Sequence, residues 1–189
     1  MLSLFEADRR DLLRLARQAV VDAVSRASLP QHIPVHGVFA ERRGIFVTLH
    51  ILRRLRGCIG VIEADEPLGE SVVRCAASAA LQDPRFPPVR VEELNALQIE
   101  ISLLTQPIPI RLKEIEIGRH GLLISRGSNR GLLLPQVAVE HRLTVEQFMQ
   151  ETCRKAQLPP DTWKHEDVQV LSFTCEVFSE DVDAIAGSA

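Results

Sequence analysis

The sequence predicts an α+β fold, and three observations support this class. Runs rich in β-branched and aliphatic residues at 44–62 and 97–104 have the composition of strands. The segments 67–80 and 144–156 instead place apolar residues three or four positions apart, as amphipathic helices do. A doubly wound parallel sheet requires strands and helices to alternate regularly along the chain, and they do not do so here. We therefore expect largely antiparallel sheets flanked by helices.

The elements are expected in the following order along the chain. A helix comes first, with apolar positions from Leu12 to Val24 at helical spacing. The strand run of 44–62, the helix of 67–80 and the half-exposed strand of 97–104 follow. Leu122–Ser125 and Leu132–Leu134 are expected to pair around a glycine loop. After the helix of 144–156, a last strand from Val168 to Phe178 shows a phase change between Val170 and Leu171, which predicts a bulge there.

Composition excludes several classes of protein. With 189 residues and 46% hydrophobic residues, the chain can form one domain or two small interlocked subdomains. The net charge is -3 and the basic residues are scattered, which argues against a nucleic-acid partner, as does the absence of tyrosine. No apolar run approaches the ~20 residues of a membrane span, and no signal peptide is recognisable, so we expect a cytoplasmic protein that does not contact a membrane.

The cysteines and histidines do not show a metal-ligand spacing. There is no Cys-x-x-Cys pair, and we expect free thiols, no metal site and no cofactor. The cysteines are Cys58, Cys75, Cys153 and Cys175, and the histidines are His32, His36, His50, His120, His141 and His165. Cys75, Cys153 and Cys175 lie on apolar stripes and are interpreted as core residues. Cys58 is the thiol that remains to be explained.

Cys58 lies in the run Leu55-Arg56-Gly57-Cys58-Ile59-Gly60, which is expected to be the second strand of a hairpin. In a strand, Arg56, Cys58 and Gly60 share a face, so a guanidinium would lie beside the thiol. Two glycines within a strand indicate a bulge, or a place where a ligand or another backbone comes close. This stretch is therefore the candidate site.

The register of the hairpin decides what the thiol faces. If Arg53 and Arg54 belong to a two- or four-residue loop, Cys58 pairs with Leu49 and its thiol is inert among aliphatic side chains. A three-residue loop instead places Cys58 opposite His50 and creates a Cys–His couple. Both alternatives remain open at this point.

Another candidate is Arg85, in the stiff segment Asp83-Pro84-Arg85-Phe86-Pro87-Pro88. Its prolines cannot continue a helix and restrict the residues before them, so the side chain of Arg85 has a fixed direction. It either contacts an anion or forms a structural ion pair with Asp83 or another acid.

The segment from Gly44 to Gly60, with its final Leu-Arg-Gly-Cys-Ile-Gly, resembles the signature of the AMMECR domain family. The resemblance covers nearly all of residues 1–189, which we interpret as a single AMMECR domain, and it implies two subdomains with a concave surface between them near the hexapeptide. One departure is Gln157, where relatives often carry glycine. Similar residues recur at 83–88, 100–102, 118–121, 134–138 and 153–156.

The resemblance also implies site residues and partners. It makes Arg85 and Gln136 candidates for the polar contacts of a cleft, with Arg56 and Lys155. The thiol chemistry itself predicts that Cys58 would be catalytic, with His50 as its base only in the register that places them opposite each other, while Gly57 and Gly60 would let a small-molecule or peptide ligand approach the backbone. Prokaryotic members are often encoded with a Memo-like protein and a radical SAM protein, hence the name AmmeMemoRadiSam system protein A, but no biochemical activity is established for the family. The two hypotheses are a cysteine-dependent enzyme component of a shared pathway and a non-catalytic binding or adaptor module. The sequence does not predict an oligomeric state.

Overall fold

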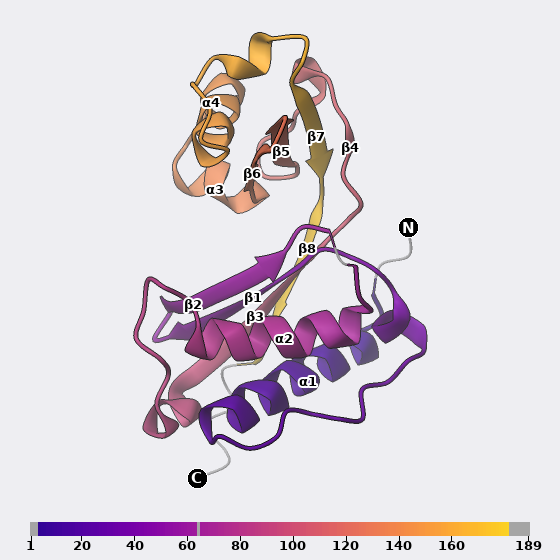
Figure 1. The fold of residues 1–189 in the computed structure, drawn as a ribbon, viewed down its shortest axis with the longest axis vertical. Coiled ribbons are helices and arrows are strands. Elements are labelled where there is room, and N and C mark those ends of the chain that lie inside the picture. The colour runs from indigo at the N-terminus through magenta and orange to yellow at the C-terminus, as the bar shows by residue number, and fades with distance from the viewer. Residues whose placement is uncertain (1–3, 64, 182–189) are drawn as a thin grey trace. The chain divides into compact units, whose positions relative to one another are not determined.

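The computed structural model describes residues 4–63 and 65–181, and it confirms the α+β class. The chain divides into two compact units (Figure 1). The first contains the chain up to Leu103 and again from Glu176, and the second contains Leu104–Cys175. The second unit is therefore inserted between two strands of the first.

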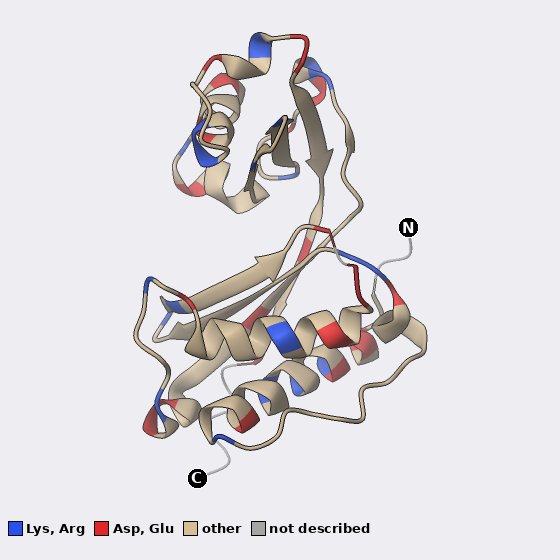
Figure 2. Cartoon of the chain, in the orientation of Figure 1, with Lys and Arg blue, Asp and Glu red and all other residues tan. Residues whose placement is uncertain are grey.

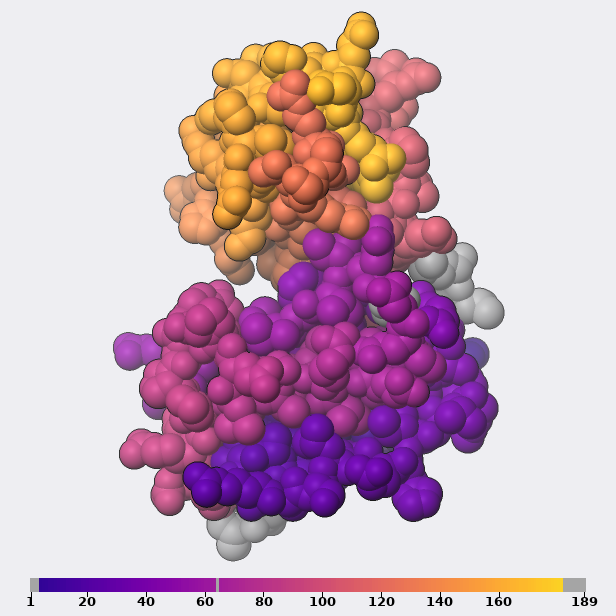
Figure 3. Space-filling model, viewed as in Figure 1, coloured from indigo at the N-terminus to yellow at the C-terminus, as the bar shows by residue number. Residues whose placement is uncertain are grey.

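The first unit is an antiparallel sheet with two helices on one face (Figure 1). Its strands lie in the order β2-β1-β3-β8, so β2 is an edge strand. The strands are β1 (Ile45–Ile51), β2 (Arg54–Val61), β3 (Leu97–Leu104) and β8 (Cys175–Ser179), and the helices are α1 (Glu6–Val24) and α2 (Leu68–Leu81), with 3-10 turns η1 (Gly37–Ala40) and η2 (Val91–Ala96). The outer sides of α1 and α2 form adjoining parts of its surface (Figure 3).

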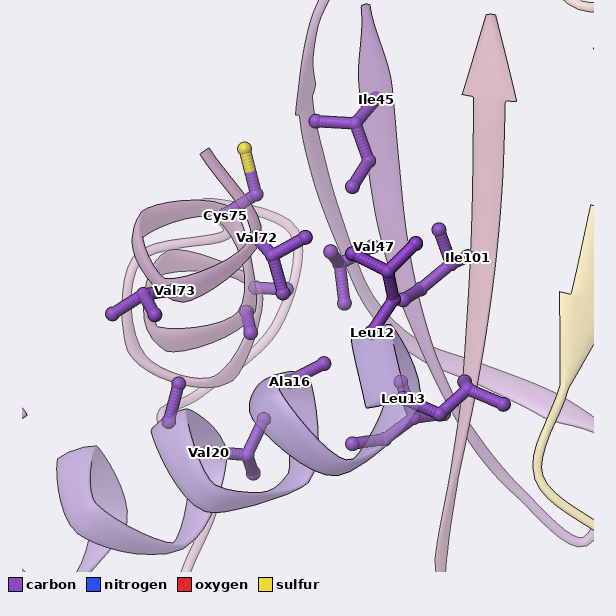
Figure 4. Close-up of a cluster of buried hydrophobic side chains, with 14 of the residues drawn as sticks. Leu12, Leu13, Ala16, Val20, Ile45, Val47, Val72, Val73, Cys75 and Ile101 are labelled. Atoms are coloured by element: carbon purple, nitrogen blue, oxygen red, sulfur yellow. The ribbon is translucent and has the colours of Figure 1, made fainter. Parts of the chain in front are cut away.

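Alternation along β1 separates the two faces of this sheet. Ile45, Val47 and Leu49 are fully buried, whereas Thr48 and His50 are only half-buried. Figure 4 shows Val47 and Ile101 of the sheet together with Leu12, Ala16 and Val72 of the helices. This period of two is what a strand with one covered face requires. The side chains of Thr48 and His50 therefore lie on the face away from the helices.

Ion pairs join α1 to β8 and to Glu180, which follows it. Arg9 contacts Glu176 of β8 at 2.6 Å, and Arg17 pairs with Glu180. Arg17 also donates to the main-chain carbonyls of Leu94 and Leu97. Helix α1 and the segment 176–180, far apart in the sequence, thus contribute to the same unit.

The second unit has a sheet of its own, in the order β4-β7-β5-β6, and a separate core around Phe148 and Met149. Its strands are β4 (Ile108–Pro109), β5 (Gly121–Arg126), β6 (Asn129–Leu133) and β7 (Gln169–Phe173), its helices are α3 (Pro135–Glu140) and α4 (Val145–Lys155), and its 3-10 turns are η3 (Leu112–Glu114) and η4 (Thr162–Lys164). Thr144 caps α4 as its sequence predicts, because its hydroxyl accepts from the Gln147 N–H.

The expected last strand, from Val168 to Phe178, is wrong. The structure contains two strands in different sheets, β7 and β8, which are separated by Thr174. The predicted bulge between Val170 and Leu171 is also wrong, because these residues pair regularly with Ile124 and Leu123. The chain instead leaves one sheet for the other at Thr174, after β7 has ended.

Charge is distributed without segregation in either unit, and Figure 2 shows basic and acidic residues interspersed along the ribbon. Within residues 4–63 and 65–181, no helix combines the length and the apolar character needed to cross a membrane.

Candidate functional site

Cys58 lies on edge strand β2 and is half-buried. Its partner across β1 is Thr48, whose hydroxyl contacts the Cys58 sulfur, with 3.3 Å between Oγ1 and Sγ. Both predicted registers are therefore wrong, because the thiol faces neither Leu49 nor His50. It meets a hydroxyl that can stabilise a thiolate by donating a hydrogen bond.

Two features of the hairpin produce this register. The turn consists of Leu52 and Arg53, one residue earlier than expected, and both have positive φ (50° and 63°). The strands then contain a bulge, because Leu49 pairs with Gly57 whereas His50 pairs with Leu55. Arg56 is the extra residue of this bulge. A bulge changes the direction of a side chain, and here it also moves the Cys58 pairing by one position.

His50 lies one diagonal step from Cys58. Because Cys58 faces Thr48, His50 is two positions along β1, a Cα separation of roughly 7–8 Å for diagonal neighbours in a sheet. The Nε2 atom of His50 is buried and has no hydrogen-bond partner among the described residues. The described part of the fold thus leaves this nitrogen unsatisfied. The direct Cys–His pair is absent from this hairpin.

The backbone of Cys58 is held by the segment that follows α2. Its N–H donates to Oδ2 of the buried Asp83 at 2.8 Å. Its carbonyl accepts from Nη2 of Arg85 at 3.1 Å. Asp83 and Arg85 are themselves paired, with 2.6 Å between Oδ2 and Nη2. One ion pair thus satisfies both outward-facing main-chain groups of Cys58, as a neighbouring strand would, and covers this part of the sheet edge.

The predicted pairing of Arg85 with Asp83 is confirmed, and it makes Arg85 the cation that accompanies Cys58. The hydrogen bond from Arg85 holds the pKa of Asp83 far below its ordinary value, with help from the Cys58 N–H. The pKa of Arg85 is raised, first by Asp83 and also by interaction with the Cys58 side chain. Half of the Arg85 side chain is exposed, and its guanidinium lies 5.5 Å from the ring centroid of Phe86.

Arg56 has other partners. Its guanidinium forms two hydrogen bonds with Glu93, at 2.8 and 3.0 Å, and two more with the carbonyls of Pro87 and Pro88. Arg56 lowers the pKa of Glu93 to about 2 through these bonds. The side chain therefore fastens the proline segment and η2 to β2. Its use in binding a ligand stays a prediction.

Both glycines of the hexapeptide are explained by packing. A Cβ at Gly57 would lie 2.2 Å from the carbonyl oxygen of Ala79 in α2, and one at Gly60 would lie 2.4 Å from the ring of Phe46. The sequence interpretation that another backbone comes close is confirmed at Gly57, and also at Gly60, where a Cβ would lie 2.3 Å from the carbonyl oxygen of Ile45. A role in admitting substrate stays a prediction for both glycines.

Sequence reasoning missed Thr48 and Glu93, and it missed the contact of Asp83 with the Cys58 backbone. Glu100 of β3 also belongs to the surroundings of Cys58, because it is the cross-strand partner of Thr48. Cys58, Thr48 and Glu100 thus form one row across three strands. The role of Asp83 could have been predicted from its position before Pro84, because a residue before proline is restricted to extended backbone and its carboxylate therefore has a fixed direction. Thr48 could not be identified, because a bulge cannot be located from composition.

The other thiols differ from Cys58 in their surroundings. Cys75 and Cys153 are fully buried, and burial raises the pKa of Cys75 to about 11 and also raises that of Cys153. Cys175 was expected in the core but is half-buried at the start of β8. Among the described residues, no group of three or more His, Cys, Asp and Glu side chains is arranged to hold a metal ion.

Gln136 and Lys155 belong to the second unit. Gln136 is half-buried near the start of α3, and Lys155 is exposed at the end of α4. Lys155 lines a groove that the second unit forms by itself. That these two residues act together with Cys58 stays a prediction.

Comparison with known proteins agrees with this architecture. The family model described as AMMECR1 matches residues 13–178. A protein of Methanothermobacter thermautotrophicus is 42% identical over 182 residues, covering 91% of this chain and 94% of its own, and one of Thermococcus gammatolerans is 44% identical over 184 residues, covering 90% and 89%. The crystal structure of an uncharacterised protein from Pyrococcus horikoshii is 40% identical, covers 94% of each chain and superposes with a TM-score of 0.85. The chain belongs to the AMMECR1 family.

Proposed function

We propose that this protein is a cysteine-dependent enzyme component in which Cys58 acts as a nucleophile or group carrier. One observation carries the proposal: Arg85, fixed by the buried carboxylate of Asp83, donates to the Cys58 carbonyl at 3.1 Å and so brings a guanidinium next to this residue. A thiolate needs a nearby cation or hydrogen-bond donor to be populated near neutral pH. Arg85 and the hydroxyl of Thr48 supply one of each.

The chemistry of such a step is limited by these groups. The thiol would lose its proton to a base, and the sulfur lone pair would then form a bond to an electrophilic carbon while the leaving group departs with its electron pair. His50 and Glu100 are the titratable groups of the same sheet face that are candidates for the base. Arg85, with half of its side chain exposed, is suited to bind an anionic part of the substrate.

The test measures alkylation of the four cysteines in the folded protein by peptide mass spectrometry across a pH series. Cys58 should react, while Cys75 and Cys153 should stay unmodified because their thiols are buried. In the double variant Asp83→Asn/Arg85→Gln, which keeps a hydrogen-bond acceptor for the Cys58 N–H, alkylation of Cys58 should slow about threefold because the cation is lost.

The matched control is Arg56→Gln/Glu93→Gln, which neutralises the other ion pair attached to β2. Cys58 should react at the wild-type rate in this variant. If both double variants slow the reaction equally, the cation beside the thiol is not specific to Arg85. If Cys58 is as unreactive as Cys75 at every pH where the fold persists, the nucleophile hypothesis fails.

A shared pathway with Memo-like and radical SAM proteins is part of the same proposal, and its support is the family resemblance. Purified Memo-like and radical SAM proteins from one genome that encodes all three should bind this chain or consume its product. The direct measurement is analytical ultracentrifugation of each pair. If neither mixture shows a complex and neither protein alters the modification state of Cys58, this part of the proposal is abandoned.

The alternative function is a non-catalytic binding or adaptor module that uses the same surface. It is favoured by the structural roles of the hexapeptide, since Arg56, Gly57 and Gly60 all have packing partners that the fold itself requires. Cys58→Ser separates the two functions. An adaptor keeps its partner affinity in that variant, whereas a cysteine-dependent component loses turnover.

A further inference from the structure

A groove with a volume of about 610 Å³ lies on the second unit, which alone supplies its walls. The apolar part of its lining, the floor, consists of Leu133 of β6, Val137 of α3 and Leu143 of the following turn. The polar part of the lining, the rim, consists of His141, Glu151, Arg154 and Lys155. Its volume is within the range of about 300–1,000 Å³ that is typical of small-molecule sites.

The local fold explains why the floor is apolar and accessible. Helix α3 ends in a turn where the Leu143 N–H donates to the Ala138 carbonyl at 2.9 Å and the Arg142 N–H to that of Val139 at 3.1 Å, with φ of +50° at Arg142. This pattern of bonds at a helix end directs the next side chain back against the helix. Leu143 and Leu133 therefore rest on the core of the second unit while they remain half-buried.

The charged side chains of the rim give it a net positive charge. Glu151 forms an ion pair with Arg154, which leaves Lys155 and His141. Within the described part of the chain, neither of these two side chains has an ion pair or a side-chain hydrogen bond at the groove. An apolar floor beside unpaired nitrogen donors complements a molecule with a hydrocarbon body and one negative charge.

We propose that this groove binds a small organic acid with an aliphatic or aromatic body, whose carboxylate meets Lys155 and His141. The body of the ligand lies on Leu133, Val137 and Leu143. Neither Cys58 nor Arg85 takes part, so the proposal is independent of the thiol chemistry suggested above.

Anilinonaphthalene sulfonate, which has an aromatic body and one negative charge, serves as the first probe with the full-length protein. Its fluorescence should rise on binding, and octanoate should displace it. Octylammonium has the same chain with the opposite charge and should displace it at least about tenfold less effectively, if the charges of the rim select the ligand. Cys58→Ser should leave this binding unchanged.

Two pairs of variants locate the site. Lys155→Gln should weaken octanoate binding about fivefold, whereas Lys113→Gln, an exposed lysine of η3 outside the groove, should not. Val137→Phe should fill the groove and weaken binding about tenfold, whereas Val139→Phe, on the same helix and 53% exposed, should bind normally. Thermal unfolding of each variant shows whether the helix end itself was altered.

Three results would overturn the proposal. The probe does not bind; octanoate and octylammonium compete equally well; or Val137→Phe and Val139→Phe have the same affinity. Absence of probe binding would show that the groove is not a binding site. Equal competition would show that it does not select organic acids, and equal affinity of the two valine variants would show that the ligand binds elsewhere on the protein.

Discussion

Two carboxylates beside β2 stay ionised in the fold: Asp83, which accepts from the Cys58 N–H, and Glu93, which pairs with Arg56. Asp83 and Glu93 have lowered pKa values because each accepts hydrogen bonds from an arginine, Arg85 and Arg56 respectively. A carboxylate with a lower pKa in the folded than in the unfolded state stabilises the fold above its unfolded pKa, and it loses that contribution as the pH falls.

The first prediction is therefore an acid-dependent loss of stability. The unfolded carboxyl groups titrate near pH ~4, and Glu93 titrates at about 2 in the folded state, so the free energy of unfolding should decline as the pH drops from about 5 to about 2. Urea unfolding at a series of pH values measures this slope. In Arg56→Gln/Glu93→Gln the slope should be shallower. An unchanged slope in that variant would show that Glu93 does not contribute.

A second prediction concerns Gly57. Substitution by alanine places a Cβ against the Ala79 carbonyl of α2, and since neither backbone can move freely, Gly57→Ala should destabilise the protein by about 3 kcal/mol. Gly37→Ala is the comparison, because Gly37 has open space around it but a φ of +58°, which costs about 1 kcal/mol. Chemical unfolding of both variants tests the order. A smaller loss at Gly57 than at Gly37 would contradict the close-packing explanation.

At the scale of elements, the chain uses glycine for close packing and other residues for several of its turns. Helices α1, α3 and α4 are followed by Arg26, Arg142 and Gln157, all with φ between 50° and 60°. The turn of the β1–β2 hairpin is Leu52-Arg53, also with positive φ. Side chains other than glycine are disfavoured in this conformation, so these positions carry strain that the surrounding contacts must offset.

Gln157 provides the third prediction. The α4 helix keeps a complete C-terminal motif, because the Leu158 N–H donates to the Cys153 carbonyl and the Gln157 N–H to that of Arg154, both at 2.9 Å. Gln157→Gly should therefore stabilise the protein by about 1 kcal/mol. Arg154→Gly, inside the same helix, should destabilise it by a similar amount. Thermal unfolding of the two variants should move in opposite directions, and a loss of stability in Gln157→Gly would show that the side chain has a favourable contact.

Sequence patterns predicted the elements of the site better than its register. β-branched and aliphatic composition predicted β1 and β2, and apolar alternation predicted β3. The prolines after Asp83 predicted a fixed backbone there, and the glycines of the hexapeptide predicted a close approach of another backbone. The pairing of Cys58 with Thr48 depends on a turn one residue earlier and on the bulge at Arg56. The sequence does not indicate this turn, because the turn contains no glycine or asparagine. It does not indicate the bulge either, because the extra residue is an arginine, which is common in regular strands too.

For the whole molecule, the two units have separate cores. The cluster around Leu12, Val47 and Val72 contains only residues of the first unit, and the cluster around Phe148 contains only residues of the second. This separation was not readable from the sequence, because strands β7 and β8 follow one another with a single residue between them and look continuous. A unit with its own core can fold alone in principle.

The last prediction uses the point where the chain enters and leaves the second unit. Thr105 donates its N–H to the Thr174 carbonyl at 3.0 Å, and the Thr174 N–H donates to the Thr105 hydroxyl at 2.9 Å. Because these residues face each other like the ends of a hairpin, replacement of residues 106–173 by Asn-Gly should leave a folded first unit. Circular dichroism and cooperative thermal unfolding measure this. Cys58 in the shortened protein should be alkylated at the full-length rate, because Thr48, Asp83 and Arg85 all remain. A folded first unit with a changed Cys58 rate would mean that the second unit controls the thiol.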